Sequence, residues 1–385
     1  MLVHRPLRVM TVMGTRPDTI KMAPVVLALK AAGPTIESIV CVTAQHREML
    51  DEVLTLFGIE ADYDLDIMTR TQSLTDITTR VLTGMERVLV EAKPDVVLVH
   101  GDTTTSTAAA LAAFYAHIPV GHVEAGLRTS SVHMPFPEEL NRRLTSVIAN
   151  YHFAPTLGSQ ANLFAERVER ECVVVTGNTV IDAFLEASRR PQCLPDALRW
   201  LDPSRPLIYV TAHRRENHAH MTEICHALAE ISLLPSRPEI LWPVHPSPMV
   251  SPIAHEMLAG IPGIHLVRPL GYADSVACVR ACAFVLTDSG GLQEEAPTLG
   301  KPVLVMRNET ERPEGLVAGT LRLIGTDRAR IVAECCNLLV DENVYQQMAR
   351  ASNPYGDGKA AERIVSWLLW KLRNGAKPLE FLIAA

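Results

Sequence analysis

The sequence predicts an α/β protein built from two doubly wound domains, each with a parallel sheet covered by helices on both faces. Short runs of β-branched residues alternate with longer amphipathic segments throughout the chain, which is the pattern of βαβ units. The length of 385 residues exceeds that of one ordinary domain. The alternation is interrupted once, in residues 188–206, which contain four prolines, and then starts again.

In the first half, apolar runs predict strands at residues 7–13, 38–42, 95–100, 119–123 and 172–176. Amphipathic segments predict helices at residues 18–32, 45–57, 105–117 and 138–150. Gly33 and Gly58 follow the first two helices, and glycine commonly stands just after the end of a helix. The run at 95–100 is almost entirely apolar, which favours a parallel strand that is covered on both faces.

The second half repeats this pattern. Strands are predicted at residues 207–211, 240–244, 264–267, 284–287 and 302–306, each followed by a helical stretch, and a last helix is expected at 359–374. We therefore predict an N-terminal Rossmann-like domain over residues 1–187, a C-terminal Rossmann-like domain over 188–358, and a segment over 359–385 whose helix packs back on the first domain. Open α/β sheets bind ligands beyond the carboxyl ends of their strands, so the two domains are expected to face a cleft.

The composition excludes several classes of protein. Hydrophobic residues make up 48% and charged residues 21% of the chain, which is typical of a folded globular protein. The net charge of −7 argues against a nucleic-acid binder. No run of ~18 apolar residues predicts a membrane helix, and the opening residues 1–6 do not form a signal peptide. The eight cysteines include no Cys-x-x-Cys pair, so we expect no zinc site and reduced thiols in the cytoplasm.

The first predicted strand ends in a turn suited to an anion. Gly14 lets the backbone approach a ligand closely, and the helix that follows presents backbone N–H groups. Arg16 and Lys21 add positive charge there, although a tight turn with a solvated arginine would give the same pattern. No suitable Gly-x-Gly-x-x-Gly run occurs, which argues against a bound nicotinamide or flavin.

Carboxylates follow the next predicted strands. Asp102 comes just after the strand at 95–100, where it would serve either in chemistry or as an ordinary helix N-cap. Glu124 lies in a glycine-bounded turn that needs no cap. Glu138 and Glu139 begin a helix, and for Glu139 the preferred interpretation is compensation of the helix dipole. Three carboxylates on neighbouring loops are well suited to proton transfer.

The second half offers groups for a phosphate. His213 stands beside two arginines at the start of a predicted helix, whereas His245 is as readily explained as a turn residue. Residues 289–291, Ser-Gly-Gly, form a strand-to-helix turn whose N–H groups suit a diphosphate. Glu295 follows about one helical turn later and is placed to accept both ribose hydroxyls, while Arg307 and Arg312 come after the next strand. No group of residues has the spacing of metal ligands.

The chain contains, in order, the runs GTRPDTIKMAPV, CVTAQHREMLDEVL, PDVVLVHGDTTT, GHVEAGLRT, PEELNRRLT, VTGNTVIDA, TAHRRE, LTDSGGLQEEAPTLGKPVLVMRNETERPE and NPYGDG. Together they resemble the non-hydrolysing bacterial UDP-N-acetylglucosamine 2-epimerases over essentially the whole chain. The resemblance implies the two-domain glycosyltransferase-B fold. It also implies reversible conversion of UDP-N-acetylglucosamine to UDP-N-acetylmannosamine for surface polysaccharide, in a cytoplasmic homodimer without a cofactor.

The resemblance assigns roles to individual residues. It implies catalytic roles for Asp102, Glu124, Glu138 and His213. It implies binding of the substrate and UDP by Arg16, Lys21, Ser289, Gly290, Gly291, Glu295 and Arg312. Many members are allosteric, and Gln45, Arg214 and His245 match their second UDP-N-acetylglucosamine site. Glu48 and Thr71 replace a glutamine and an arginine that some members carry there.

The residues fit the chemistry of this reaction. If UDP leaves first, C1 becomes an oxocarbenium-like centre and the proton on C2 becomes acidic, so that a carboxylate can take it and leave 2-acetamidoglucal. Reprotonation on the opposite face and return of UDP give the epimer, which explains the need for more than one carboxylate. Two alternatives stay open, a UDP-sugar-dependent glycosyltransferase of the same fold and a hydrolysing 2-epimerase.

Overall fold

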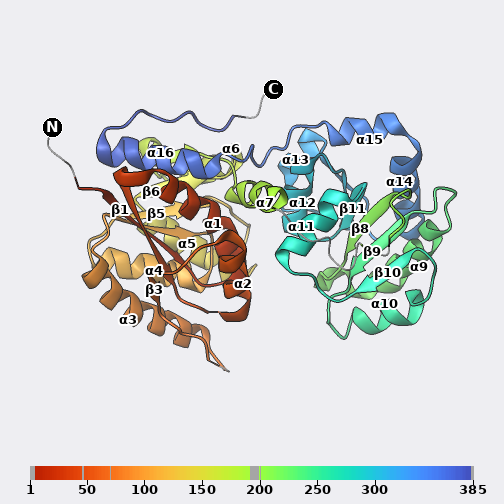
Figure 1. Ribbon diagram of the computed structural model, residues 1–385, viewed down its shortest axis with the longest axis horizontal. Helices are drawn as coiled ribbons and strands as arrows, with labels where there is room; N and C mark the ends of the chain where they lie inside the picture. Colours follow the sequence, from red (N-terminus) through yellow and green to blue (C-terminus); the bar gives the residue numbers. More distant parts are fainter. Residues whose placement is uncertain (1–4, 46, 70, 191–198, 200, 383–385) are drawn as a thin grey trace. The chain divides into compact units, whose positions relative to one another are not determined.

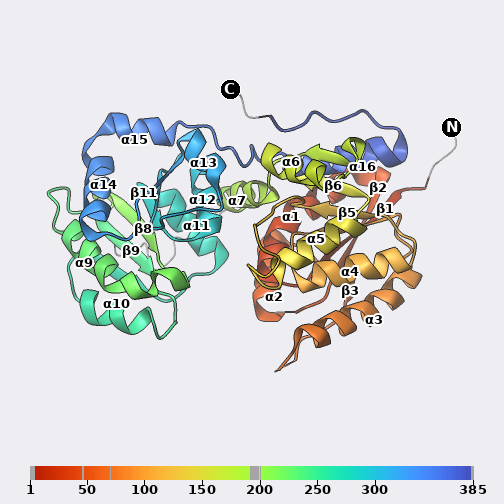
Figure 2. The ribbon, with the colours of Figure 1, turned by 180° about the vertical axis from the view of Figure 1, so that it is seen from behind.

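The computed structural model describes residues 5–45, 47–69, 71–190, 199 and 201–382. The chain divides into two compact units, the first formed by Met1–Glu186 with Gly356–Leu382 and the second mainly by Ala187–Tyr355. Each unit has its own parallel sheet with helices on both faces (Figure 1 and Figure 2), which confirms the predicted fold class. Within the described residues, no helix is long and apolar enough to cross a membrane.

The sheet of the first unit has seven parallel strands in the order β3-β2-β1-β4-β5-β6-β7. The strands are β1 (Leu7–Met13), β2 (Ile36–Val42), β3 (Tyr63–Asp64), β4 (Val96–His100), β5 (Val120–Val123), β6 (Tyr151–Ala154) and β7 (Val173–Val175). The order reverses direction between β1 and β4, and in doubly wound sheets the ligand binds at this point, beyond the carboxyl ends of the strands.

The helices of the first unit connect these strands. They are α1 (Arg16–Ala31), α2 (Arg47–Phe57), α3 (Leu74–Ala92), α4 (Thr104–Tyr115), α5 (Glu138–Ile148), α6 (Leu157–Ala165), α7 (Thr179–Arg189) and α16 (Ala360–Arg373). Every residue of β4 is buried, as its apolar run predicts. On one face of the sheet, Val97 and Val99 of β4 pack with a run of small alanines in α4 and with Met85 of α3.

Helix α16 packs against α1 within the first unit, although it follows the second unit in the chain (Figure 1). Its Trp367 ring lies edge-on to Tyr151 and Phe153 of β6, at centroid distances of 5.0 and 5.4 Å. Asp182 of α7 accepts hydrogen bonds from the backbone N–H groups of Ala360 and Ala361, which caps the start of α16.

The second unit has a six-stranded parallel sheet in the order β10-β9-β8-β11-β12-β13. The strands are β8 (Leu207–Thr211), β9 (Glu239–Pro243), β10 (Ile264–Val267), β11 (Phe284–Thr287), β12 (Val303–Val305) and β13 (Leu321–Leu323). The helices are α9 (Met221–Ser232), α10 (Ser251–Leu258), α11 (Tyr272–Ala281), α12 (Gly290–Glu295), α13 (Pro313–Ala318), α14 (Arg328–Val340) and α15 (Glu342–Ala349). Its core surrounds the fully buried Trp242.

Most predicted strands agree with the structure to within one or two residues. Strand β6 lies outside the predicted set, because its residues, Tyr-His-Phe-Ala, include no β-branched side chain and include a buried histidine. The edge strands β3, which has only two residues, and β13, which has an arginine at its centre, also lie outside the predicted set. Of the expected linker, residues 191–198 and 200 lie outside the described residues, and residues 188–189 form the end of α7.

Candidate functional site

The turn after β1 is built around the buried carboxylate of Asp18. Asp18 accepts hydrogen bonds from the backbone N–H groups of Gly14 and Thr15, at 3.2 and 2.7 Å, and so fixes the start of α1. Burial raises the pKa of Asp18 to about 6, although these hydrogen bonds oppose the shift. A Cβ atom on Gly14 would lie 2.0 Å from Thr43 Oγ1 and 2.6 Å from Thr105 Oγ1, so only glycine fits this turn.

The two cations of this turn differ in their surroundings. Arg16 is the first residue of α1, and its Nε atom is buried with no hydrogen-bond partner among the described residues. Lys21 lies one turn further along the helix and donates a hydrogen bond to Glu124 Oε1 at 2.5 Å. The sequence-predicted cation and carboxylate therefore meet directly, although Lys21 follows β1, Glu124 follows β5 and β4 lies between these two strands.

Glu124 is held tightly at the end of β5. Its side chain is 6% exposed, and its Oε1 atom accepts a second hydrogen bond from Asn178 Nδ2 at 2.9 Å. Its Oε2 atom lies 3.6 Å from His100 Nε2. The backbone of Glu124 has φ of +62°, a left-handed conformation that is uncommon for a residue with a side chain and is concentrated at functional sites.

Asp102 follows β4 and is not the cap of the next helix. Thr103 is the N-cap of α4, because its hydroxyl accepts from Ser106 N at 3.1 Å. The helix-cap interpretation of Asp102 is therefore wrong, and its carboxylate instead forms an ion pair with Arg142 of α5. Burial raises the pKa of Asp102, Glu124 raises it further, and Arg142 opposes the shift.

The two glutamates at the start of α5 have different environments. Glu138 is half-buried and has no ion-pair partner among the described residues. Glu139 is fully buried, accepts from Thr129 N at 3.1 Å and from Arg143 Nε at 2.7 Å, and pairs with Arg142 at 3.4 Å. Glu139 thus anchors two arginines and a loop, so compensation of the helix dipole is only part of its role.

Three buried histidines lie on adjacent strands near this cluster, namely His100 on β4, His122 on β5 and His152 on β6. Burial lowers their pKa values to about 4, 3 and 4, so all three are neutral at neutral pH. His122 Nε2 donates a hydrogen bond to the carbonyl of Gly101 at 2.7 Å, because a carbonyl can only accept. This bond fixes the turn that carries Asp102.

In the second unit, Asp288 follows β11 and its carboxylate fixes the turn that follows β8. Its buried carboxylate accepts from the backbone N–H groups of His213 and Arg214 at 2.8 Å each, and from Asn217 Nδ2 at 3.1 Å. His213 Nδ1 lies 3.3 Å from Asp288 Oδ1, and the His213 ring stacks on His245. Burial lowers the pKa of His213, and the nearby Asp288 partly restores it.

The glycine turn of the second unit joins β11 to α12, as predicted. Ser289 is the N-cap residue of α12, and its backbone N–H donates to Thr287 Oγ1 at 2.9 Å. A Cβ atom on Gly290 would come within 3.3 Å of the Arg214 guanidinium, and one on Gly291 within 3.9 Å of the Glu295 carboxylate. A positive and a negative side chain therefore flank the turn.

The two arginines after β12 are both engaged in ion pairs. Arg312 pairs with the buried Glu294 of α12, and Arg307 Nε lies 2.5 Å from Glu216 Oε1. Each guanidinium would therefore share its charge between a carboxylate and any bound anion.

In the first unit, Gln45 lies just before α2 rather than inside it, and its Oε1 atom accepts from Thr105 Oγ1 at 2.9 Å.

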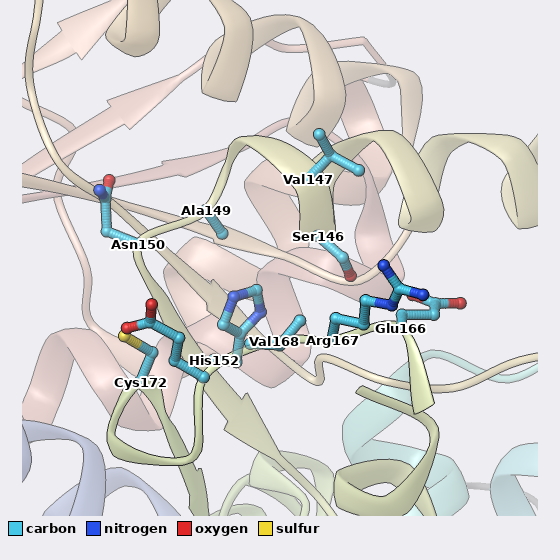
Figure 3. A pocket seen from close by; sticks show the side chains of 10 residues that line it. Ser146, Val147, Ala149, Asn150, His152, Glu166, Arg167, Val168 and Cys172 are labelled. Atoms are coloured by element: carbon cyan, nitrogen blue, oxygen red, sulfur yellow. The ribbon is translucent and has the colours of Figure 1, made fainter. Parts of the chain in front are cut away.

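One cavity lies away from the sequence-predicted site residues. Figure 3 shows a cavity of about 440 Å³ at the C-terminal ends of α5 and α6, lined by residues such as Ser146, His152, Glu166 and Cys172. None of the described residues that line it belongs to the predicted site. A second cavity, of about 240 Å³, includes Glu216 and Arg307 in its wall. Over the part of the chain that the structure describes, no group of three His, Cys, Asp or Glu is arranged to hold a metal ion.

A family model described as UDP-N-acetylglucosamine 2-epimerase matches residues 28–369. The chain belongs to this family. It is 54% identical over 372 residues to the UDP-N-acetylglucosamine 2-epimerase of Escherichia coli strain K12, which covers 94% of this chain and 98% of the relative. The motif resemblance noted in the sequence is therefore confirmed.

Two solved structures of the epimerase family share the fold over the whole chain. A putative UDP-N-acetylglucosamine 2-epimerase from Listeria monocytogenes matches with a TM-score of 0.93 and 46% identity, over 98% of this chain and 100% of the other. The enzyme from Neisseria meningitidis bound to UDP-GlcNAc matches with a TM-score of 0.85 and 47% identity, over 94% and 100%. The expectation of two Rossmann-like units of the glycosyltransferase-B type agrees with these likenesses.

Sequence reasoning missed several residues that hold the site of this epimerase-family chain. They are His100, Arg142, Asn178 and Asp288, which contact predicted residues directly. His100 is the last residue of β4 and Asp288 comes directly after β11, so their positions at strand ends would have identified them. Arg142 lies inside a helix, where nothing in the sequence distinguishes it from a solvated arginine.

Proposed function

We propose that this chain reversibly converts UDP-N-acetylglucosamine to UDP-N-acetylmannosamine without hydrolysing either. The observation that carries the proposal is the pair of carboxylates at the ends of β4 and β5, Asp102 with Arg142 and Glu124 with Lys21. The relatives named as UDP-N-acetylglucosamine 2-epimerases, and the Neisseria meningitidis structure bound to UDP-GlcNAc, support the choice of substrate.

In the proposed reaction, UDP leaves before any proton moves. The bond from C1 to the phosphate oxygen breaks, its electron pair leaves with UDP, and C1 becomes oxocarbenium-like. We propose that Arg16 and Lys21 stabilise the departing charge, because positive side chains near a developing anion lower the barrier. The UDP group is assigned to His213, Ser289, Gly290, Gly291, Glu295 and Arg312.

The proton on C2 then moves to a carboxylate. The electron pair of the C2–H bond becomes the C1–C2 double bond of 2-acetamidoglucal. Proton return to the opposite face, followed by attack of UDP on C1, completes the epimer. We assign this proton transfer to Asp102, Glu124 and Glu138, because two faces of one carbon need two proton-transfer groups.

A single experiment tests this function. The purified protein is incubated with UDP-N-acetylglucosamine in D₂O, without added metal or NAD, and followed by NMR. We expect UDP-N-acetylmannosamine with deuterium at C2, and unchanged rates after treatment with EDTA. Free N-acetylmannosamine would instead identify a hydrolysing 2-epimerase, and transfer of the sugar to an added acceptor a glycosyltransferase. Absence of any deuterium at C2 would contradict the proposal.

We also propose that the chain forms a homodimer through the outer face of α5. Leu140, Leu144 and Val147 recur at helical spacing on this face and are 44%, 45% and 85% exposed, next to Phe136 at 65%. Clustered exposed apolar side chains of this kind mark protein interfaces. Sedimentation should give a dimer for the unaltered protein and a monomer for Leu144→Glu, whereas Leu233→Glu, an exposed leucine of the second unit, should remain dimeric. A monomeric unaltered protein would contradict this.

We place the enzyme in the cytoplasm. Its described cysteines, for example Cys41 and Cys172, are free thiols, and free thiols persist in a reducing compartment. Fractionation of the native host cells with an antibody against the chain tests this location, and recovery of the protein outside the cytoplasmic fraction would contradict it.

A further inference from the structure

The strongest feature outside the assigned roles is the contact of His100 with Glu124. His100 is the last residue of β4, and its side chain is 5% exposed. Its Nε2 atom is buried, lies 3.6 Å from Glu124 Oε2 and has no hydrogen-bond partner among the described residues. A buried nitrogen without a partner is costly, and such atoms in native proteins often have a functional reason.

The two oxygens of Glu124 have different surroundings. Lys21 and Asn178 both donate hydrogen bonds to Oε1. The Oε2 atom lies beside His100 and over Gly101, whose hypothetical Cβ would be 3.2 Å from it. Oε2 is therefore the oxygen of Glu124 that faces the histidine ring.

His100 is neutral where it lies. Burial lowers its pKa to about 4, Glu124 opposes this shift, and Lys21 adds to it. The other charged or titratable groups around this point are Asp102 after β4 and His122 on β5. A neutral imidazole has one nitrogen that accepts a hydrogen bond. The separation of 3.6 Å exceeds a hydrogen bond and fits two acceptor atoms with no proton between them.

We propose that His100 is a positioning residue whose Nε2 atom accepts a hydrogen bond from Glu124 once Oε2 has taken the C2 proton. The inference rests on the proposed function. The C2–H electron pair becomes the C1–C2 double bond, the proton binds Oε2, and the O–H group then points at Nε2. In the reverse direction the same proton returns from Oε2 to C2. His100 itself is neither protonated nor in contact with the sugar.

Three substitutions separate this role from a structural one. His100→Gln places an amide oxygen near the position of Nε2, and His100→Asn places its amide near Nδ1 instead. His100→Phe keeps a flat ring without any nitrogen. We expect the His100→Phe and His100→Asn variants to lower kcat ~10²-fold, which is the effect of a misplaced catalytic group, with KM nearly unchanged. Gln should recover most of kcat.

A kinetic isotope effect provides a second measurement. Substrate carrying deuterium at C2 should show a larger isotope effect on kcat in the Asn variant than in the unaltered protein, because C2–H cleavage becomes slower relative to other steps. Thermal unfolding and UDP binding serve as controls for folding. If the Phe variant does not fold, the comparison of Gln with Asn decides the question by itself.

The outcomes distinguish the inference from the proposed function. Equal loss of kcat in the Gln and Asn variants, or a rise in KM in place of a fall in kcat, would overturn the positioning role alone. An unaltered protein that forms no UDP-N-acetylmannosamine would overturn the proposed function and this inference with it.

Discussion

Asp102 and Arg142 form an ion pair although they come from different elements, the turn after β4 and the middle of α5. The same Arg142 also pairs with Glu139, which is fully buried. One guanidinium therefore links a candidate catalytic carboxylate to a structural one. Burial raises the pKa of Asp102 by more than the Arg142 guanidinium lowers it. A carboxyl group with a raised pKa is better suited to exchange a proton near neutral pH.

Loss of a carboxylate should abolish most of the chemistry without loss of binding. Asp102→Asn, Glu124→Gln and Glu138→Gln keep the shape of each side chain but remove the proton acceptor. We expect turnover to fall ~10²–10⁴-fold, the usual contribution of general acid–base groups. UDP affinity, measured by calorimetry, should change little. A variant that expels UDP but cannot return the proton should release 2-acetamidoglucal.

The matched control for these variants is Glu60→Gln, an exposed carboxylate of the first unit. It should keep normal turnover. If all three site variants keep near-normal turnover and deuterium exchange at C2, the assignment is wrong and His213 becomes the next candidate.

Replacement of Arg142 by methionine should cost stability as well as activity. It leaves the fully buried Glu139 with only Arg143 as an ion-pair partner among the described residues. Breaking a buried ion pair costs about 3 kcal/mol or more, so the free energy of unfolding in urea should fall by that order. Arg143→Met should cost less, because that side chain is more exposed, at 37% against 12%. Equal losses of unfolding free energy in Arg142→Met and Arg143→Met would show that Arg142 contributes no more to stability than Arg143.

The buried histidines predict loss of stability in acid. The pKa of His122 is about 3 in the folded protein and 6.5 in the free side chain. As the pH falls from 6.5 toward 3, only the unfolded chain takes up this proton, so the free energy of unfolding decreases by up to ~1.4 kcal/mol per pH unit. His122→Asn should show a shallower decrease in urea titrations between pH 6.5 and 4.5.

Asp18 acts in the opposite direction, because its pKa is raised to about 6 and the folded protein binds that proton first. Its stabilising effect is present at low pH and is lost as the pH rises through 6. Since Asp18 is present in the unaltered protein and in His122→Asn, its effect cancels when their pH profiles are compared. Parallel pH profiles for the unaltered protein and His122→Asn would contradict the prediction for His122.

Gly14→Ala should damage the first turn. The added Cβ would overlap the Thr43 and Thr105 hydroxyls, and overpacking of this kind costs about 1–3 kcal/mol. Because Arg16 follows directly, we also expect turnover to fall. Gly33→Ala is the control, since nothing lies within 4 Å of its Cβ, although its φ of +62° carries a cost of about 1 kcal/mol. Thermal unfolding and turnover measure both variants, and equal effects would exclude the close approach as the cause.

Much of the fold could be predicted because it rests on local patterns. The strands Leu7–Met13, Leu207–Thr211, Ile264–Val267 and Phe284–Thr287 agree with prediction residue for residue, since an apolar run flanked by turns is a property of consecutive residues. The candidate residues Asp102 and Glu124 are predictable in the same way, because Glu124 follows β5 directly and Asp102 follows β4 with only Gly101 between. Strand β6 has no β-branched residue to mark it as a strand, and its place in the sheet comes from pairing with β5 and β7.

The sequence by itself determined the alternation of strands and helices, and hence which polar residues stand at the carboxyl ends of strands. Only the tertiary structure decided which of them meet. In the first unit, Lys21 and Asn178 both donate hydrogen bonds to Glu124. In the second unit, Asp288 accepts a hydrogen bond from the backbone of His213. In each unit, the order of strands in the sheet brings these distant segments to the carboxyl-end edge of that sheet. That order depends on packing of the whole sheet and not on any local run of residues.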